Sequence, residues 1–228
     1  MDDSTSFQVY GNSKEQDKTN QAVDETRGEK IWYRNHVATA YYYSTSFGKT
    51  TSIEAWGTSF NETNQYLQSR AICDEEGVDY EKELPWYRWS VEVGEREMSD
   101  LIETNTQTEI GTLLNIAITK EGAGGIVQEI TAVGTTGKVI VSTENKIRKM
   151  LGGNIYQIKK QDGSLVNGTT LLPSAFFEIE KRNGTYTIRG GGYGHGIGMS
   201  QNGANQMAKD KKNYREILHA FYAGIEIR

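Results

Sequence analysis

The sequence has 228 residues and a net charge of −5, and its 24% charged and 36% hydrophobic residues are ordinary proportions for a globular protein, which argues against wholesale disorder. With that charge and no basic block to offset it, nucleic acid is not expected as a partner. No apolar run is long enough to cross a membrane, and no charged region followed by an apolar one marks an export signal at the start.

The first third of the chain predicts a helix and a hairpin. Residues 8–10 resemble the end of a strand, and DKTNQAVDETRG predicts a helix over residues 17–28. KIWYRNHVATAYYYSTS predicts a hairpin that turns at residues 34–35. Three of its residues are expected on one face: Val37, Tyr41 and Tyr43. The following FGKTTSIEAWG is expected to form a polar loop.

The middle of the chain alternates strands and short helices. Residues 73–85, CDEEGVDYEKELP, are acidic and predict an exposed connection. WYRWSVEV predicts a strand, and SDLIETN predicts a short helix with Ser99 as its N-cap. GIVQEITAVGTTGKVIVST predicts two strands about a turn at residues 134–137. STENKIRKMLGG predicts a helix that Ser142 caps and Gly152 ends.

The last third predicts a hairpin followed by two helices. FFEIEKRNGTYTIRG contains Asn183–Gly184, a pair that suits a type I′ turn. Helices are expected over residues 201–209 and 214–222. With no internal repeat and no flexible linker, the predicted fold is α+β, strand-rich with antiparallel hairpins, a few short helices and two helices at the C-terminus. We expect one compact unit over residues 1–228.

A metal site is not expected. Cys73 is the single cysteine, so it forms no internal disulfide and cannot anchor a cysteine-based zinc site alone. The three histidines, His36, His195 and His219, are scattered without a chelating spacing. The near absence of cysteine leaves the redox compartment open.

The segment IRGGGYGHGIGMSQNGANQMAK, residues 188–209, is the most unusual in the chain. Six glycines fall between positions 190 and 198, interrupted by Tyr193, His195 and Ile197. Each glycine weakens regular structure by roughly 0.5–1 kcal/mol relative to alanine, so the cluster needs a reason. A dinucleotide-binding turn is disfavoured, because the upstream strand belongs to an antiparallel hairpin and no second parallel strand follows. A P-loop is disfavoured because no Lys-Ser/Thr pair follows the last glycine.

Two interpretations of the glycines stay open. In the first, bare backbone lets a bulky carbohydrate or peptide approach, with the Tyr193 ring as a stacking face and His195 titrating near neutral pH. In the second, the glycines permit a tight crossover and His195 merely hydrogen-bonds a backbone carbonyl. The thirteen tyrosines and four tryptophans are equally ambiguous, since aromatic side chains stack on sugars but also favour sheet surfaces.

GGGYGHGIGMSQNGANQMA resembles the C-terminal signature of the stage II sporulation protein D family, which includes the amidase-enhancer proteins. Further segments match in the family's order, and they cover nearly the whole chain: FQVYG at residues 7–11, QAVDETRGE at 21–29, YYYSTSFGKT at 41–50, AWG at 55–57, IRKMLGG and LPSAFFEIE. The resemblance implies peptidoglycan chemistry. Sporulation members are lytic transglycosylases that thin the wall between mother cell and forespore during engulfment. They cleave the β-1,4 bond from N-acetylmuramic acid to N-acetylglucosamine and leave a 1,6-anhydro end.

Two departures from the family matter. The family's catalytic glutamate lies in a helix of the type EALKAQAVAARTY before the QVY segment, and this chain begins almost at that segment. By resemblance, the catalytic acid is therefore expected outside this chain, on an N-terminal portion that it lacks. Some members hold zinc on His and Cys residues around QVY, where this sequence has residues 4–7, STSF. No zinc and no other cofactor are expected.

The resemblance also implies the sites of sugar contact. In the family, a serine-rich loop and the histidine loop line the glycan groove. The candidate substrate-binding residues are Ser44, Ser46, Lys49 and Thr50 on one side and Tyr193, His195, Ser200 and Gln201 on the other. Phe47 replaces a glycine that is frequent in relatives, which puts the groove width in question. For His195 the resemblance implies a supporting role, either polarising the catalytic carboxyl or holding an N-acetyl group. If Lys49 does not contact sugar, it is a solvated charge on an exposed loop.

Three hypotheses follow from these observations. The first is a lytic transglycosylase domain that is inactive without the segment bearing its acid. The second is a non-catalytic glycan-binding module or amidase enhancer that recruits a partner hydrolase. Both place the protein outside the cytoplasm facing the wall, with a membrane-anchored parent, peptidoglycan strands as ligand and other sporulation wall hydrolases as further partners. Both require Ser46 and His195 to border one concavity; the third, a structural domain without sugar contact, requires them to lie far apart.

Overall fold

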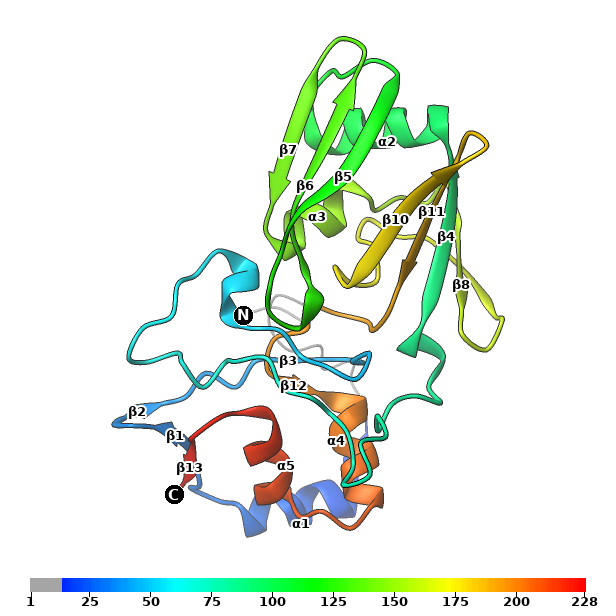
Figure 1. The fold of residues 1–228 in the computed structure, drawn as a ribbon. Helices are drawn as coiled ribbons and strands as arrows, with labels where there is room; N and C mark the ends of the chain where they lie inside the picture. Colours follow the sequence, from blue (N-terminus) through cyan, green and yellow to red (C-terminus); the bar gives the residue numbers. More distant parts are fainter. Residues whose placement is uncertain (1–13) are drawn as a thin grey trace.

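The computed structural model describes residues 14–228, and its largest sheet has five antiparallel strands (Figure 1). In spatial order these are β10 (Phe177–Arg182), β11 (Thr185–Gly190), β4 (Trp89–Gly94), β8 (Gln157–Lys160) and β9 (Leu165–Asn167). The β10–β11 turn has positive φ at both central residues, 49° at Asn183 and 75° at Gly184. A type I′ turn requires this, so the predicted hairpin is confirmed.

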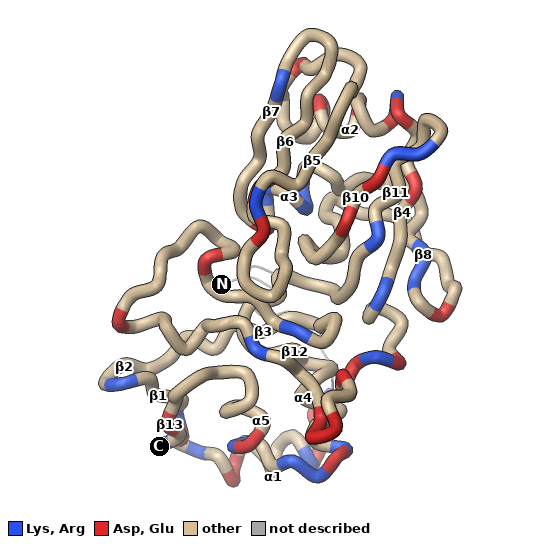
Figure 2. The backbone as a smooth tube through the Cα atoms, viewed as in Figure 1, with Lys and Arg blue, Asp and Glu red and all other residues tan. Residues whose placement is uncertain are grey.

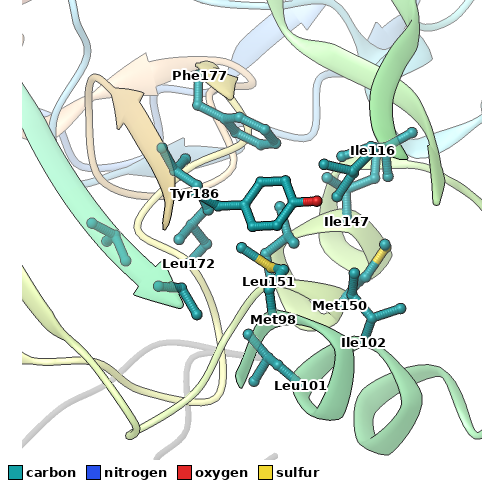
Figure 3. Packing of buried hydrophobic residues seen from close by; sticks show 14 of the residues in the cluster. Met98, Leu101, Ile102, Ile116, Ile147, Met150, Leu151, Leu172, Phe177 and Tyr186 are labelled. Carbon is teal, nitrogen blue, oxygen red and sulfur yellow. The ribbon is translucent and has the colours of Figure 1, made fainter. Parts of the chain in front are cut away.

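A three-stranded antiparallel sheet stands beside it, made of β5 (Leu113–Glu121), β6 (Val127–Gly134) and β7 (Lys138–Ser142). The predicted strand pair about residues 134–137 is confirmed as β6–β7, whereas β5 was not predicted. Helices α2 (Glu95–Thr106) and α3 (Glu144–Met150) complete a large hydrophobic cluster with the two sheets. Figure 3 shows the Tyr186 ring of β11 pointing into this cluster toward Ile147 and Ile116.

Both helix caps predicted in this region are wrong. α2 begins four residues before Ser99, and the Ser99 hydroxyl donates to the Glu95 carbonyl while accepting from the Leu113 amide, at 2.9 Å each. Ser99 therefore ties the interior of α2 to β5, a tertiary role that local sequence does not reveal. The N-cap of α3 is Thr143 rather than Ser142, and its side chain makes no capping hydrogen bond.

The remaining elements surround a second hydrophobic cluster. A three-stranded sheet joins β13 (Glu226–Ile227), β1 (Ile31–Tyr33) and β2 (His36–Val37), and a parallel pair joins β3 (Tyr42–Tyr43) to β12 (Met199–Ser200). The helices here are α1 (Asp17–Glu25), α4 (Gln201–Lys209) and α5 (Tyr214–Phe221). Three short 3-10 turns are η1 (Ile53–Trp56), η2 (Pro85–Tyr87) and η3 (Ala123–Gly125). The predicted α+β class is confirmed, and within residues 14–228 no helix is both long and apolar enough to span a bilayer.

Several local predictions need correction. α1 ends at Glu25, three residues early, while α4 has the predicted bounds. The turn at residues 34–35 is confirmed, but the expected common face is wrong, because Val37 is 55% exposed and Tyr43 is 5% exposed. β2 ends at Val37, and β3 pairs with β12 instead of extending the hairpin. The strand expected at residues 8–10 lies outside the described residues.

The segment predicted as a polar loop is largely buried, and the acidic connection predicted to be exposed contains one buried carboxylate. Residues 50–53 of the FGKTTSIEAWG segment are all buried, and η1 forms there. Glu81, in the acidic connection, is 0% exposed. Both segments lie beside the glycine-rich stretch, which leaves β11 at Gly190 and reaches β12 at Met199 (Figure 1). That stretch connects the two hydrophobic clusters, and the candidate site forms around it.

Candidate functional site

The site begins where the serine-rich segment and the glycine-rich segment run alongside each other. Besides the parallel pairing of β3 with β12, an antiparallel bridge joins Thr45 to Tyr193 and a parallel bridge joins Thr51 to Ile197. The Tyr193 amide donates to the Thr45 carbonyl at 2.7 Å, and the Thr45 amide donates back at 3.1 Å. The two segments that the sequence assigned to one groove are therefore adjacent.

The glycines permit close contact with the protein's own chain. Gly194 has φ of 122°, and a Cβ there would lie 2.7 Å from the Cβ of Tyr43. Gly198 has φ of 76°, and a Cβ there would collide with the Tyr41 carbonyl oxygen. Any side chain at these positions would carry both a backbone penalty and a steric one. The crossover interpretation thus accounts for these two glycines without a ligand.

Both ring nitrogens of His195 are used by the backbone. Nδ1 accepts a hydrogen bond from the Ile197 amide at 3.1 Å, so the ring proton is assigned to Nε2, which donates to the Tyr42 carbonyl at 2.9 Å. Burial lowers the pKa of His195, an effect that the nearby Glu144 carboxylate partly opposes. The ring is neutral at pH 7 and lies between Tyr43 and Trp56, with centroids 5.5 and 5.1 Å away. His195 therefore fixes the loop and has no free nitrogen for proton transfer in this arrangement.

A cleft of about 860 Å³ opens between these segments and α3. Four of the predicted substrate-binding residues line it: Ser44, Tyr193, His195 and Gln201. Tyr42 and Tyr193 are each 38% exposed there, and Asn145 and Thr169 add uncharged polar groups. The cleft thus has aromatic rings with hydroxyl and amide groups beside them.

The other four predicted residues do not line this cleft. Ser46 is 1% exposed and Ser200 0% exposed, and both hydroxyls point to Glu81. Thr50 is also buried, where its hydroxyl accepts from the Arg70 amide at 2.8 Å. Lys49 is exposed and bridges to the segment at Ala71. The expectation that Ser46 borders the same concavity as His195 is therefore wrong. The two glycan hypotheses now depend on Ser44 of the same segment, which lines the cleft beside His195. A sugar contact by any of the eight residues stays a prediction.

Glu81 was not identified from the sequence, yet this buried residue joins the serine-rich segment to the glycine-rich segment. Its carboxylate accepts hydrogen bonds from the Ser46 amide at 3.0 Å, from the Ser46 hydroxyl and from the Ser200 hydroxyl at 2.7 Å. Ser200 is also the N-cap of α4, where its oxygen accepts from the Gly203 amide. Burial raises the pKa of Glu81, although its hydrogen bonds with the two serines act in the opposite direction. Glu81 positions the loops and is closed off from the cleft.

Glu144 is the one carboxylate among the described residues that line the cleft. It is 1% exposed and accepts from the Arg148 guanidinium at 2.6 Å and from the Trp56 indole at 3.2 Å. Arg148 also donates to the Leu172 carbonyl at 2.8 Å. Both oxygens of the Glu144 carboxylate are thus engaged by Arg148 and Trp56, and neither is directed at the open part of the cleft. The i, i+4 spacing of Glu144 and Arg148 on a predicted helix was the available sequence signal.

No group of three or more His, Cys, Asp or Glu side chains that could hold a metal ion occurs among residues 14–228. The lining of the cleft is nearly neutral overall, because the charges of Glu144 and Arg148 compensate and His195 is uncharged. This favours a polar, uncharged ligand over an ion.

Comparisons with known proteins agree with the motifs. A family described as "Domain of unknown function (DUF8618)" matches residues 29–198. The chain is 29% identical to the amidase enhancer of Bacillus subtilis over 97% of its own length and 34% of that protein's. It is 32% and 29% identical to stage II sporulation protein D of Bacillus amyloliquefaciens and Bacillus subtilis, over its whole length and 59% of theirs. The chain thus spans about one-third to three-fifths of these relatives, and the resemblance predicted from its motifs is confirmed.

Proposed function

Since this chain belongs to the DUF8618 family and is related to stage II sporulation protein D and amidase enhancer, we propose that it acts on the bacterial cell wall. In this proposal the cleft beside His195 binds a glycan strand of peptidoglycan. The protein then works outside the cytoplasm, facing the wall, as part of a longer membrane-anchored protein that cooperates with other wall hydrolases.

The composition of the cleft carries this proposal. The exposed faces of Tyr42 and Tyr193 suit stacking on pyranose rings, which present C–H groups on one side. The side chains of Ser44, Asn145 and Gln201 offer hydrogen bonds to sugar hydroxyl and acetamido groups. A volume of about 860 Å³ accommodates two or more sugar rings, as expected for a polymer cleft.

The first candidate activity on such a strand is lytic transglycosylation at the bond from N-acetylmuramic acid to N-acetylglucosamine. A carboxylic acid protonates the glycosidic oxygen as its bond to C1 breaks. The C6 hydroxyl of the same muramic acid then attacks C1 and gives its proton to the carboxylate, which forms the 1,6-anhydro product and restores the acid. Neither Glu144 nor Glu81 suits this role, because the first is ion-paired and the second is sealed from the cleft. The reaction therefore needs a carboxylic acid from outside the described residues.

The second candidate is a glycan-binding amidase enhancer that does not cleave. The Glu144–Arg148 pair supports it, because the one carboxylate that lines the cleft among residues 14–228 is engaged in a buried ion pair. One relative that matches 97% of this chain carries the name "Amidase enhancer". Both candidates share the binding step, so that step is tested first.

The test measures binding to purified sacculi and release of 1,6-anhydro muropeptides by mass spectrometry. Wild-type protein is expected to sediment with sacculi, and Tyr193→Ala is expected to weaken that binding about two- to tenfold, the cost of one aromatic contact. Phe60→Ala is the matched control, since Phe60 is also 38% exposed but lies away from the cleft. Both candidates predict that the 228-residue chain alone binds without releasing anhydro products. Release by a longer protein that adds the acid-bearing segment selects the first candidate, and binding without release by that longer protein selects the second. Absence of binding, or equal binding by both variants, refutes the proposal.

A further inference from the structure

A second groove, of about 800 Å³, lies on the five-stranded sheet, and its lining is cationic. Arg88, Lys159, Lys160 and Arg189 border it, together with two carboxylates, Glu121 and Glu178. Figure 2 shows these basic positions on β8, at the base of β4 and on β11. A local positive excess is notable in a chain whose net charge is −5.

The strand register explains how the charges meet. Lys159 pairs with Ser90, Ser90 with Arg189, and Arg189 with Glu178. Paired residues project to the same side of a sheet, so this row crosses four strands on one face. The hairpin between β5 and β6 supplies Glu121 and Gly125 on the opposite side of the groove.

Three of the four cations have no acidic partner in the described part of the chain. Arg189 forms an ion pair with Glu180 at 3.0 Å, whereas Arg88, Lys159 and Lys160 form none. The Arg88 guanidinium is instead held by the Tyr87 and Phe47 carbonyls and lies over the Tyr87 ring, 3.9 Å from its centroid. Cations held in a concave surface without a counter-charge attract an anionic ligand.

The groove and the glycan cleft share no lining residue, but both lie close to Trp86. The Tyr193 ring of the cleft packs on the Trp86 ring at 4.6 Å, and Lys160 of the groove lies 5.3 Å from the centroid of that same ring. One indole therefore separates the two sites. An extended peptide advances about 3.3 Å per residue, so three residues cover about 10 Å, enough to pass from the Tyr193 ring across Trp86 to Lys160.

We propose that this groove binds the acidic peptide that branches from a peptidoglycan strand lying in the cleft. This inference rests on the proposed function and adds the peptide to the ligand. The peptide carries carboxylates for Arg88 and Lys159, and an amine on its side chain for Glu121 or Glu178. Apolar walls at Phe47 and Phe176 suit its methyl groups. A phosphate polymer carries no cation, so the two carboxylates of the groove disfavour it.

The experiment measures binding of four probes to the full chain by calorimetry at low and high salt. They are a peptide-free N-acetylglucosamine–N-acetylmuramic acid oligosaccharide, the same glycan with its acidic pentapeptide, the free pentapeptide, and poly(glycerol phosphate). The pentapeptide glycan is expected to bind more tightly than the bare glycan, and added salt is expected to reduce that advantage. Lys159→Glu is expected to weaken the peptide probes about fivefold or more while sparing the bare glycan. Arg189→Glu is a second variant, and Lys138→Glu, exposed on β7, is the matched control.

The outcomes separate this inference from the function on which it rests. Equal binding of the two glycans, unchanged in Lys159→Glu, overturns the peptide groove while the glycan cleft stands. If the free pentapeptide binds and Lys159→Glu weakens that binding, the groove is supported. If the bare glycan does not bind in the same experiment, the glycan cleft is refuted but the groove is not. Tighter binding of poly(glycerol phosphate) than of the pentapeptide, lost in Lys159→Glu, overturns the assignment to a peptide. Equal weakening by the Lys138→Glu control overturns the location.

Discussion

Removal of the Glu81 carboxylate is expected to loosen both walls of the cleft together. Glu81→Ala leaves the buried Ser46 amide without its acceptor, at a cost of about 1–3 kcal/mol, and strands the hydroxyls of Ser46 and Ser200 beside a cavity. The total loss of unfolding free energy should be about 3–5 kcal/mol. Glu81→Gln keeps one acceptor oxygen and should lose only about 1–2 kcal/mol.

Chemical denaturation followed by tryptophan fluorescence measures these differences. Glu83→Ala is the matched control, because Glu83 belongs to the same acidic segment but is exposed, and it should change stability by less than about 0.5 kcal/mol. A functional readout accompanies stability. Ser44 lies two residues before Ser46, and Gln201 follows Ser200, so Glu81→Gln should weaken glycan binding although Glu81 does not line the cleft. An alanine variant within about 1 kcal/mol of wild type would refute the positioning role.

The pH dependence gives an independent check on Glu81. Burial raises the pKa of its carboxyl in the folded chain, so the folded state binds that proton more tightly than the unfolded state. The resulting stabilisation is complete below the ordinary glutamate pKa of about 4.3 and is lost as the pH rises through the raised folded-state value. Because the glutamine side chain of the Glu81→Gln variant does not titrate, wild type should lose stability relative to that variant as the pH rises above about 4.3. An opposite slope would show that the hydrogen bonds outweigh burial.

Three further predictions concern the remaining parts of the site. His195→Gln should lower the free energy of unfolding by about 1–2 kcal/mol, because a hydrogen bond to the backbone is lost. Burial lowers the pKa of His195, so wild type should lose stability relative to this variant as the pH falls below about 6.5. Denaturation at several pH values measures both effects. Gly198→Ala should cost more than about 3 kcal/mol and Gly184→Ala only about 1 kcal/mol, because both have positive φ but only the first would meet backbone; equal thermal shifts would contradict this. Arg148→Met should cost about 3–5 kcal/mol by leaving Glu144 buried without a cation, and adding Glu144→Gln should recover much of the loss in a double-mutant cycle.

Sequence patterns predicted the structure correctly where contacts between residues close in the chain determine it. The Asn183–Gly184 turn fixes its own backbone, and the bounds of α4 follow from a serine N-cap and an uninterrupted helical segment. Family motifs placed the serine-rich segment beside the glycine-rich one, and the structure brings them together through the Thr45–Tyr193 bridge. The motifs could not say which face of each segment is open. Alternation in an irregular loop does not fix orientation, and so Ser44 and Ser46 were grouped although Ser44 lines the cleft and Ser46 is buried.

Contacts between distant segments explain the predictions that failed. Glu81 stands among acidic neighbours, a pattern typical of a solvated loop. Its burial depends on Ser46 and on Ser200, which lies 119 residues away in the chain. Ser99 resembled an N-cap for the same reason: the partner that reveals its role, the Leu113 amide, belongs to a strand that was not predicted.

The position of His195 bears on how any activity of this cleft would depend on pH. A histidine among glycines invites assignment as an acid or base, yet its ring spans from the Ile197 amide to the Tyr42 carbonyl and so joins the glycine-rich segment to β3. Protonation at Nδ1 would remove the acceptor for Ile197 and set two N–H donors against each other, which agrees with the lowered pKa. Titration of His195 would therefore change the shape of the cleft that a glycan contacts, and it would not add or remove a proton donor to the glycan. Binding that weakens in wild type as the pH falls below the ordinary histidine pKa of about 6.5, but stays constant in His195→Gln, would follow from loss of that arrangement. If wild-type binding were instead strengthened by acid, a protonated imidazole would be contacting the sugar directly, and the structural role assigned to this ring would be wrong.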